Sequence, residues 1–207
     1  MNKCAGVFVK DFMKRYLGAT TNRYKHAPIR MMENKHRHKT TIGCTRHPYG
    51  WYVSFYTYLE NNIGFKMGFD EFIKTYTEHS RALLSLGGKG IRRKFENLYP
   101  PRTNLPIGAY TYFFINYFSN HARAIFTQWD IKALKRNKEY FLKDIDHLMR
   151  VETLREDMIK VFGEKYREAI ENFPRKNASV NKPTLTDEHK AIIKERDSIL
   201  MEYLDYE

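Results

Sequence analysis

The chain has 207 residues, 42% of them hydrophobic, which is enough to bury one core, and we expect a single domain over residues 1–207. Lys and Arg outnumber Asp and Glu by 36 to 24, and the net charge of +12 favours a polyanionic ligand or partner. Two cysteines and the lack of a long apolar stretch exclude a secreted disulfide scaffold and a membrane protein, and predict a soluble cytoplasmic chain.

The first quarter of the sequence alternates between short apolar runs and polar segments. Residues 4–9 are predicted to form a short buried strand, and the apolar spacing over 10–17 predicts a brief helix after it. A β-rich run over 40–45 predicts a second strand. Pro48 then fits the first turn of a helix that ends near residue 62.

The rest of the chain is predicted to be mostly helical. Helices are expected over 72–86 with Asp70 as cap, 108–118, 152–162 and 187–204 with Thr186 as cap, and a strand over 145–151. Strands separated by helices favour a parallel sheet covered on both faces. The sequence therefore predicts a helix-rich α/β fold with a small parallel β-sheet flanked by helices.

Arg46 and Ser54 form the candidate binding pair. Arg46 follows the predicted strand directly, and open α/β sheets bind ligands at the carboxyl ends of their strands. Ser54 lies about two turns into the predicted helix. A guanidinium offers forked, charged donors that match phosphate geometry, and a hydroxyl adds a donor from another side. The pair therefore predicts a site for one phosphate dianion.

The stretch that begins at Arg46, R-H-P-Y-G-W-Y-V-S-F-Y, resembles the 3′-phosphate motif of the sulfotransferase family, including short phage-encoded sulfotransferase-like proteins. Later segments resemble the family in the same order. Their matching residues are Glu152, Leu154, Asp157, Asn177, Ser179, Asp197 and Tyr206. The resemblance implies a P-loop NTPase-like fold that binds 3′-phosphoadenosine 5′-phosphosulfate (PAPS), with Arg46 and Ser54 on the 3′-phosphate.

The resemblance also implies a loop for the 5′-phosphosulfate of PAPS. Family members carry Lys-x-Gly-x-Thr-Thr between a strand and a helix, whose first N–H groups bind the anion. This chain has Y-L-G-A-T-T at the corresponding place, with Tyr16 in the position of the Lys. The residues assigned to this part of the PAPS site are Lys14, Arg15, Gly18, Thr20 and Thr21.

His26 is the candidate catalytic base. It lies in YKHAPIRMM, which is similar to the family segment that carries the base. An imidazole with a pKa near 6.5 can accept a proton from an attacking hydroxyl or amine near neutral pH. The resemblance thus implies an enzyme that transfers a sulfuryl group from PAPS to a hydroxyl or amine. The sequence leaves open whether a glycan, a small molecule or a protein side chain carries that acceptor.

Two other functions remain open from the sequence. One is a sulfotransferase-like protein that has kept the anion site without catalysis. The other is nucleic-acid binding, because residues 1–50 hold 11 Lys and Arg against 2 acidic residues, a net +9. No metal site is expected, since His36, His38, His47 and Cys44 lack the paired spacing of known sites. Lys89, Arg92 and Arg93 are reserve candidates for the 3′-phosphate, and the aromatic residues of 110–118 are expected in the core.

Overall fold

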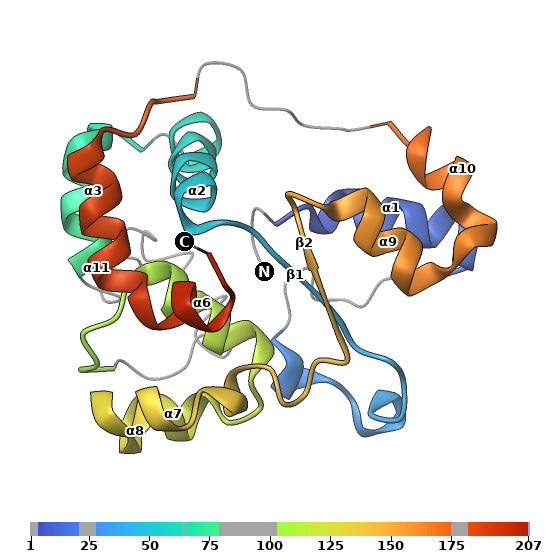
Figure 1. Ribbon diagram of the computed structural model, residues 1–207, viewed down its shortest axis with the longest axis horizontal. Helices are drawn as coiled ribbons and strands as arrows, with labels where there is room; N and C mark the ends of the chain where they lie inside the picture. The colour runs from blue at the N-terminus through green and yellow to red at the C-terminus, as the bar shows by residue number, and fades with distance from the viewer. Residues whose placement is uncertain (1–3, 21–27, 64, 79–102, 175–181, 207) are drawn as a thin grey trace.

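The computed structural model describes residues 4–20, 28–63, 65–78, 103–174 and 182–206. Strands β1 (Ile42–Thr45) and β2 (His147–Arg150) pair in parallel, with Ile42 opposite His147 and Thr45 opposite Arg150. Their carboxyl ends therefore meet at one edge, which we call the strand tip (Figure 1). The long stretch between the strands crosses over through helices, as parallel pairing requires.

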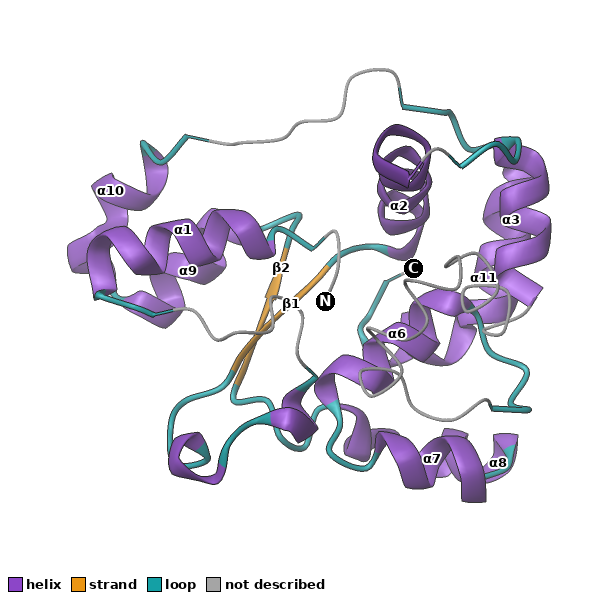
Figure 2. Ribbon diagram, turned by 180° about the vertical axis from the view of Figure 1, so that it is seen from behind, coloured by secondary structure: helices purple, strands orange, loops and turns teal. Residues whose placement is uncertain are grey.

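Helices lie on both sides of the strand pair, so the predicted helix-rich α/β fold is confirmed in its coarse form (Figures 1 and 2). One side carries α1 (Gly6–Leu17) and α9 (Leu154–Phe162). The other side carries α2 (Pro48–Ile63), α3 (Phe69–Glu78), α6 (Ala109–Phe118) and α11 (Asp187–Tyr203). The smaller elements are η1 (Ile29–Met31), η2 (Asn34–His36), α7 (Ala122–Gln128), α8 (Ile131–Arg136) and η4 (Lys138–Phe141).

The start of the chain corrects one prediction, because residues 4–9 do not form a strand. Helix α1 begins at Gly6 and buries Phe8, Val9 and Phe12 on one face, which is helical spacing. Phe173 packs edge-on against Phe8 and Phe12, with ring centroids 5.2 and 5.5 Å apart. A short apolar run does not by itself distinguish a strand from a buried helix turn, and here the aromatic partners favour the helix.

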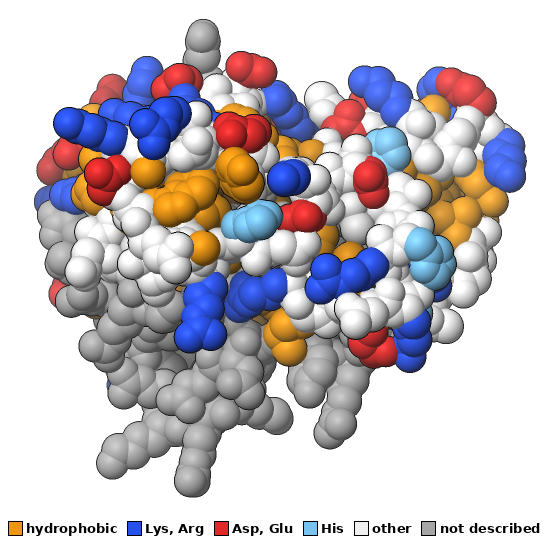
Figure 3. All heavy atoms as spheres, turned by 90° about the horizontal axis from the view of Figure 1, so that it is seen from below, with side chains coloured by type: hydrophobic (Ala, Val, Ile, Leu, Met, Phe, Trp, Pro, Cys, Tyr) orange, Lys and Arg blue, Asp and Glu red, His pale blue; other side chains and the backbone are white. Residues whose placement is uncertain are grey.

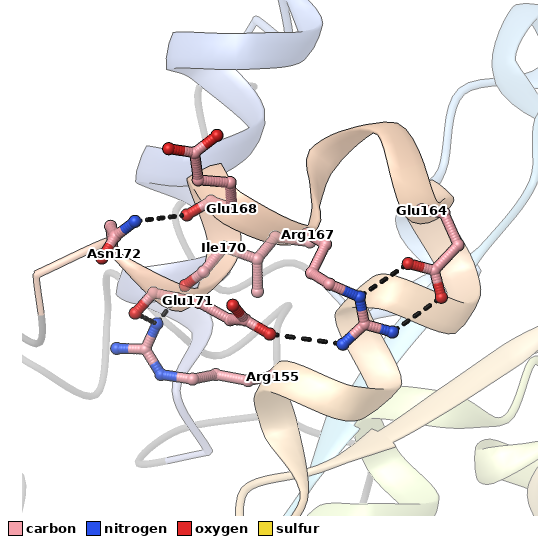
Figure 4. Close-up of polar contacts among 7 residues, drawn as sticks. All are labelled: Arg155, Glu164, Arg167, Glu168, Ile170, Glu171 and Asn172. Carbon is pink, nitrogen blue, oxygen red and sulfur yellow. Dashed lines mark hydrogen bonds and ion pairs between the residues drawn. The ribbon is translucent and has the colours of Figure 1, made fainter.

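Two short helices complete the lobe around α1, namely η5 (Glu164–Tyr166) and α10 (Arg167–Glu171). Arg167 donates to both carboxylate oxygens of Glu164 at 2.7 Å and to Glu171 at 3.2 Å (Figure 4). Arg155 on α9 donates to the last carbonyls of α10 and to the Phe173 carbonyl. These bonds satisfy the end of α10 and hold Phe173 under α1.

The centre of the other lobe is a buried carboxylate on α11. Asp197 is fully buried and accepts a hydrogen bond from the Tyr52 hydroxyl at 2.7 Å. The Thr111 amide and hydroxyl donate to its other oxygen at 2.8 and 2.6 Å. Because Tyr52 belongs to α2 and Thr111 to α6, one side chain joins three helices. The aromatic residues of α6 are buried, as predicted for core packing.

Most other predicted elements are confirmed, including α9, the strand β2, and α11 with its Thr186 cap and capping box. Helix α3 begins at Phe69, so Asp70 lies in its first turn and is not the cap residue. There the Asp70 carboxylate pairs with His189 of α11 and with Lys74, both at 3.1 Å. The predicted end of this helix lies outside the described residues. None of the described helices combines the length and apolarity needed to cross a bilayer.

Candidate functional site at the strand tip

The Arg46 side chain lies over Gly50, which is four residues before Ser54 on α2. A Cβ on Gly50 would lie 3.0 Å from Arg46 Nε and 3.7 Å from Nη2, so the guanidinium folds back over the first turn of the helix. Residues four apart share a helix face, which puts Gly50 and Ser54 on one side. Ser54 is 5% exposed and Arg46 is half-buried. Gly50, which lacks a side chain, therefore leaves room for the guanidinium over the first turn of α2.

The position of Arg46 is electrostatically unusual. Its positive charge lies over the first turn of α2, where the helix dipole is also positive. The Tyr49 amide in that turn donates to His47 Nδ1 at 3.2 Å, which satisfies one of the orphan N–H groups. A cation at the N-terminus of a helix is unfavourable unless an anion lies nearby. The Glu152 carboxylate, which accepts a hydrogen bond from the His47 amide just before this turn, is one such anion.

The N-terminus of α1 approaches the same tip. Cys4 is fully buried, and it is close enough to Arg46 and Glu152 for both to act electrostatically on its thiol, whose pKa burial raises to about 12. Ala5 then adopts the left-handed conformation, with φ 54° and ψ 12°, and no side chain caps the helix. A left-handed residue before a helix start turns successive N–H groups to one side, forming a nest for anions.

Glu152 is a carboxylate that borders this site. It follows β2, is exposed, and accepts a hydrogen bond from the His47 amide at 2.9 Å. Its other oxygen lies 3.5 Å from the Tyr206 hydroxyl. The Tyr206 ring packs against the His47 ring with centroids 5.0 Å apart. The guanidinium carbon of Arg150 also lies over the Tyr206 ring, 5.0 Å from its centroid. The C-terminal segment therefore helps to build the strand tip.

Most of the residues assigned from Y-L-G-A-T-T lie elsewhere, and this corrects their predicted placement. Lys14 and Arg15 occupy the last turn of α1, Gly18 is its C-cap with φ 63°, and Thr20 is exposed beyond it. Helix α1 has 12 residues, so its two ends are about 18 Å apart. The segment follows a helix C-terminus, where the dipole is negative and disfavours an anion. Thr21 lies outside the described residues.

The structure also shows a helix start that the sequence analysis missed, at residues 4–6. A lysine and a glycine stand close together in Lys3-Cys4-Ala5-Gly6, directly before a run that proves helical. This signal was available in the sequence, but it was hidden by the interpretation of 4–9 as a strand. Among the other candidates, His26, Lys89, Arg92, Arg93, Asn177 and Ser179 lie outside the described residues.

The exposed basic stretch Lys35, Arg37 and Lys39 precedes β1, so it lies at the amino ends of the strands, opposite the strand tip. Figure 3 views the molecule from that side and shows Lys and Arg side chains mixed with Asp and Glu. The described part of this face is therefore not a uniform cationic surface. Within the described ranges, no cluster of three or more His, Cys, Asp or Glu side chains could hold a metal ion.

Comparison of the sequence with protein-family models, with curated proteins and with solved structures yields no match. The functional assignment therefore depends on the residues and geometry of the strand tip.

Proposed function

We propose that this chain is a sulfotransferase whose strand-tip site binds PAPS. The observation that carries the proposal is the Arg46 guanidinium folded over Gly50, one helical turn before Ser54, at the positive end of α2. The resemblance of the Arg46 segment to the family's 3′-phosphate motif supports the same assignment. A P-loop NTPase-like form of the α/β fold is part of this proposal.

Each end of the nucleotide has a suitable partner at the strand tip. Arg46 and Ser54 would donate hydrogen bonds to the 3′-phosphate. The N–H groups at the start of α1, after Ala5, would bind the 5′-phosphosulfate in place of residues 14–21. These N–H groups would also stabilise the negative charge that builds on the bridging oxygen as it leaves.

PAPS supplies an activated sulfuryl group. In the proposed reaction the acceptor oxygen or nitrogen attacks sulfur, the bond from sulfur to the bridging oxygen breaks, and 3′,5′-adenosine bisphosphate leaves. The acceptor proton passes to a base, for which His26 is our candidate. The strand tip would hold the nucleotide in line for this attack. The acceptor is proposed only as a class, a hydroxyl or an amine.

Titration calorimetry with 3′,5′-adenosine bisphosphate tests this function. Arg46→Ala should weaken binding about 10- to 100-fold, because a charge-assisted hydrogen bond contributes roughly 1.5–3 kcal/mol. Arg37→Ala removes the same charge from the opposite end of β1 and should leave the affinity within about twofold of wild type.

Three results separate the alternatives. Absence of binding by the wild type, or equal binding by wild type and Arg46→Ala, would overturn the proposal. Equal weakening by both Arg variants would indicate unspecific attraction to a basic protein, as expected for nucleic-acid binding. Nucleotide binding without any transfer of radiolabelled sulfate from PAPS, across a panel of phenolic, glycan and amine acceptors, would favour the non-catalytic binding protein.

A further inference from the structure

Two buried hydroxyl groups hold the backbone of Arg46. The Tyr110 hydroxyl donates to the Arg46 backbone carbonyl at 2.6 Å and lies 2.5 Å from the Thr45 hydroxyl. Tyr110 and Thr45 are fully buried. The pair of hydroxyls therefore ends on a backbone carbonyl in the short link between β1 and α2.

The direction of these bonds follows from the number of hydrogens. A tyrosine hydroxyl has one hydrogen, and that of Tyr110 points to the Arg46 carbonyl. Thr45 must then be the donor in its contact with Tyr110. Neighbouring hydrogen bonds that run in one direction polarise one another, which strengthens the bond to the carbonyl. Buried hydrogen bonds from Thr45 to Tyr110 and from Tyr110 to the carbonyl thus hold the Arg46 peptide in place.

Tyr110 can hold this peptide because its own helix is fixed. Its amide lies 3.3 Å from the Tyr52 hydroxyl, to which it donates. The next residue, Thr111, is bound to Asp197 through both its amide and its hydroxyl. The carboxylate thereby anchors α6 to α2, and the hydroxyl of Tyr110 transmits this anchorage to the strand tip.

We propose that Tyr110 is a positioning residue that sets the direction of the Arg46 side chain and so confers preference for nucleotides with a 3′-phosphate. The inference rests on the proposed function, because it assigns the 3′-phosphate to Arg46. Tyr110 does not touch the nucleotide in this account. It acts by fixing the carbonyl, and with it the backbone from which the guanidinium reaches over Gly50.

The test compares the affinities of 3′,5′-adenosine bisphosphate and adenosine 5′-monophosphate, measured by calorimetry on the full chain. Their ratio reports the contact with the 3′-phosphate and is insensitive to a general loss of folded protein. Tyr110→Phe should lower this ratio by up to about tenfold, which corresponds to one neutral hydrogen bond and is less than the loss of the guanidinium. The affinity for the monophosphate should stay within about twofold of wild type, since it makes no contact with Arg46.

Tyr117→Phe is the matched control, because it removes a hydroxyl from the same helix about two turns from Tyr110. Its ratio should equal that of wild type. Thr45→Val removes the preceding hydroxyl at nearly constant volume and should lower the ratio in the same direction. If circular dichroism shows that Tyr110→Phe does not fold, the affinity ratio of Thr45→Val decides whether the hydroxyl network positions Arg46.

The outcomes distinguish this inference from the proposed function. If folded Tyr110→Phe has the same affinity ratio as wild type, the positioning role is overturned and the Arg46 site is left intact. The same holds for Thr45→Val if Tyr110→Phe does not fold. A wild type that binds both nucleotides equally overturns the proposed 3′-phosphate site and the inference with it. A ratio that falls in Arg46→Ala and, by less, in Tyr110→Phe supports both.

Discussion

Gly108→Ala is expected to lower the free energy of unfolding by about 3 kcal/mol, the combined cost of overpacking and of a disturbed buried hydrogen-bond network. A Cβ at this position would lie 2.3–2.4 Å from the carboxylate atoms of Asp197. The carboxylate cannot move aside without losing its bonds from Tyr52 and Thr111. For a chain of this length the melting temperature should fall by roughly 6–12 °C.

Gly68→Ala is the control for this effect. Gly68 precedes α3, and no atom lies within 4 Å of where its Cβ would stand. Its substitution should cost no more than about 1 kcal/mol, the effect of replacing a helix N-cap glycine by alanine. Urea denaturation of both variants provides the comparison. Equal stability of Gly108→Ala and Gly68→Ala would show that α6 and α11 do not approach as closely as described.

The stability contribution of Asp197 is expected to fall as pH rises from about 4 to 6.5. Burial raises the pKa of this carboxyl from 3.8 to about 6, although hydrogen bonds from Thr111 and Tyr52 act in the opposite direction. Between these values the folded chain keeps a proton that the unfolded chain has lost, so raising the pH favours unfolding. The difference between the pKa of this carboxyl in the unfolded and in the folded chain corresponds to about 3 kcal/mol of stability. The contribution is fully present below pH 4 and lost above pH 6.

Asp197→Asn isolates this contribution, because asparagine does not titrate. The free energy of unfolding of wild type minus that of the variant, measured by urea denaturation at several pH values, should fall by about 2 kcal/mol from pH 4 to pH 6.5. Subtraction removes the titration of exposed groups such as Asp70, whose pKa is lowered by His189. A difference that stays flat, or that rises with pH, would contradict the assigned pKa.

The sequence predicted the central unit of the fold because its signals are local. An apolar run ends at Arg46, Pro48 starts a helix, and the apolar spacing continues to its end, so β1 and α2 required no knowledge of distant residues. Helical periodicity likewise puts Gly50 and Ser54 on one face of α2. The Thr186 cap of α11 was predictable for the same reason.

The start of α1 was not predictable in this way, because distant residues decide its structure. Phe8 and Phe12 are buried by Phe173, which lies more than 150 residues later in the chain. Without that partner, residues 4–9 carry no signal that separates helix from strand.

The network around Asp197 shows a second limit. The sequence marked Asp197 only as a matching residue of the C-terminal region. Its partners Tyr52 and Thr111 come from two other helices, and their amides and hydroxyls become donors only once those helices pack together. The same holds for Tyr110, whose sequence context predicted core packing but not a bond to the Arg46 carbonyl.

A crystal structure of the chain with 3′,5′-adenosine bisphosphate tests the strand-tip site most directly. We expect the 3′-phosphate within hydrogen-bonding distance of the Arg46 guanidinium and the Ser54 hydroxyl, and the 5′-phosphate at the N–H groups that follow Ala5. A nucleotide bound instead at the far end of α1, beside Lys14 and Gly18, would contradict the site.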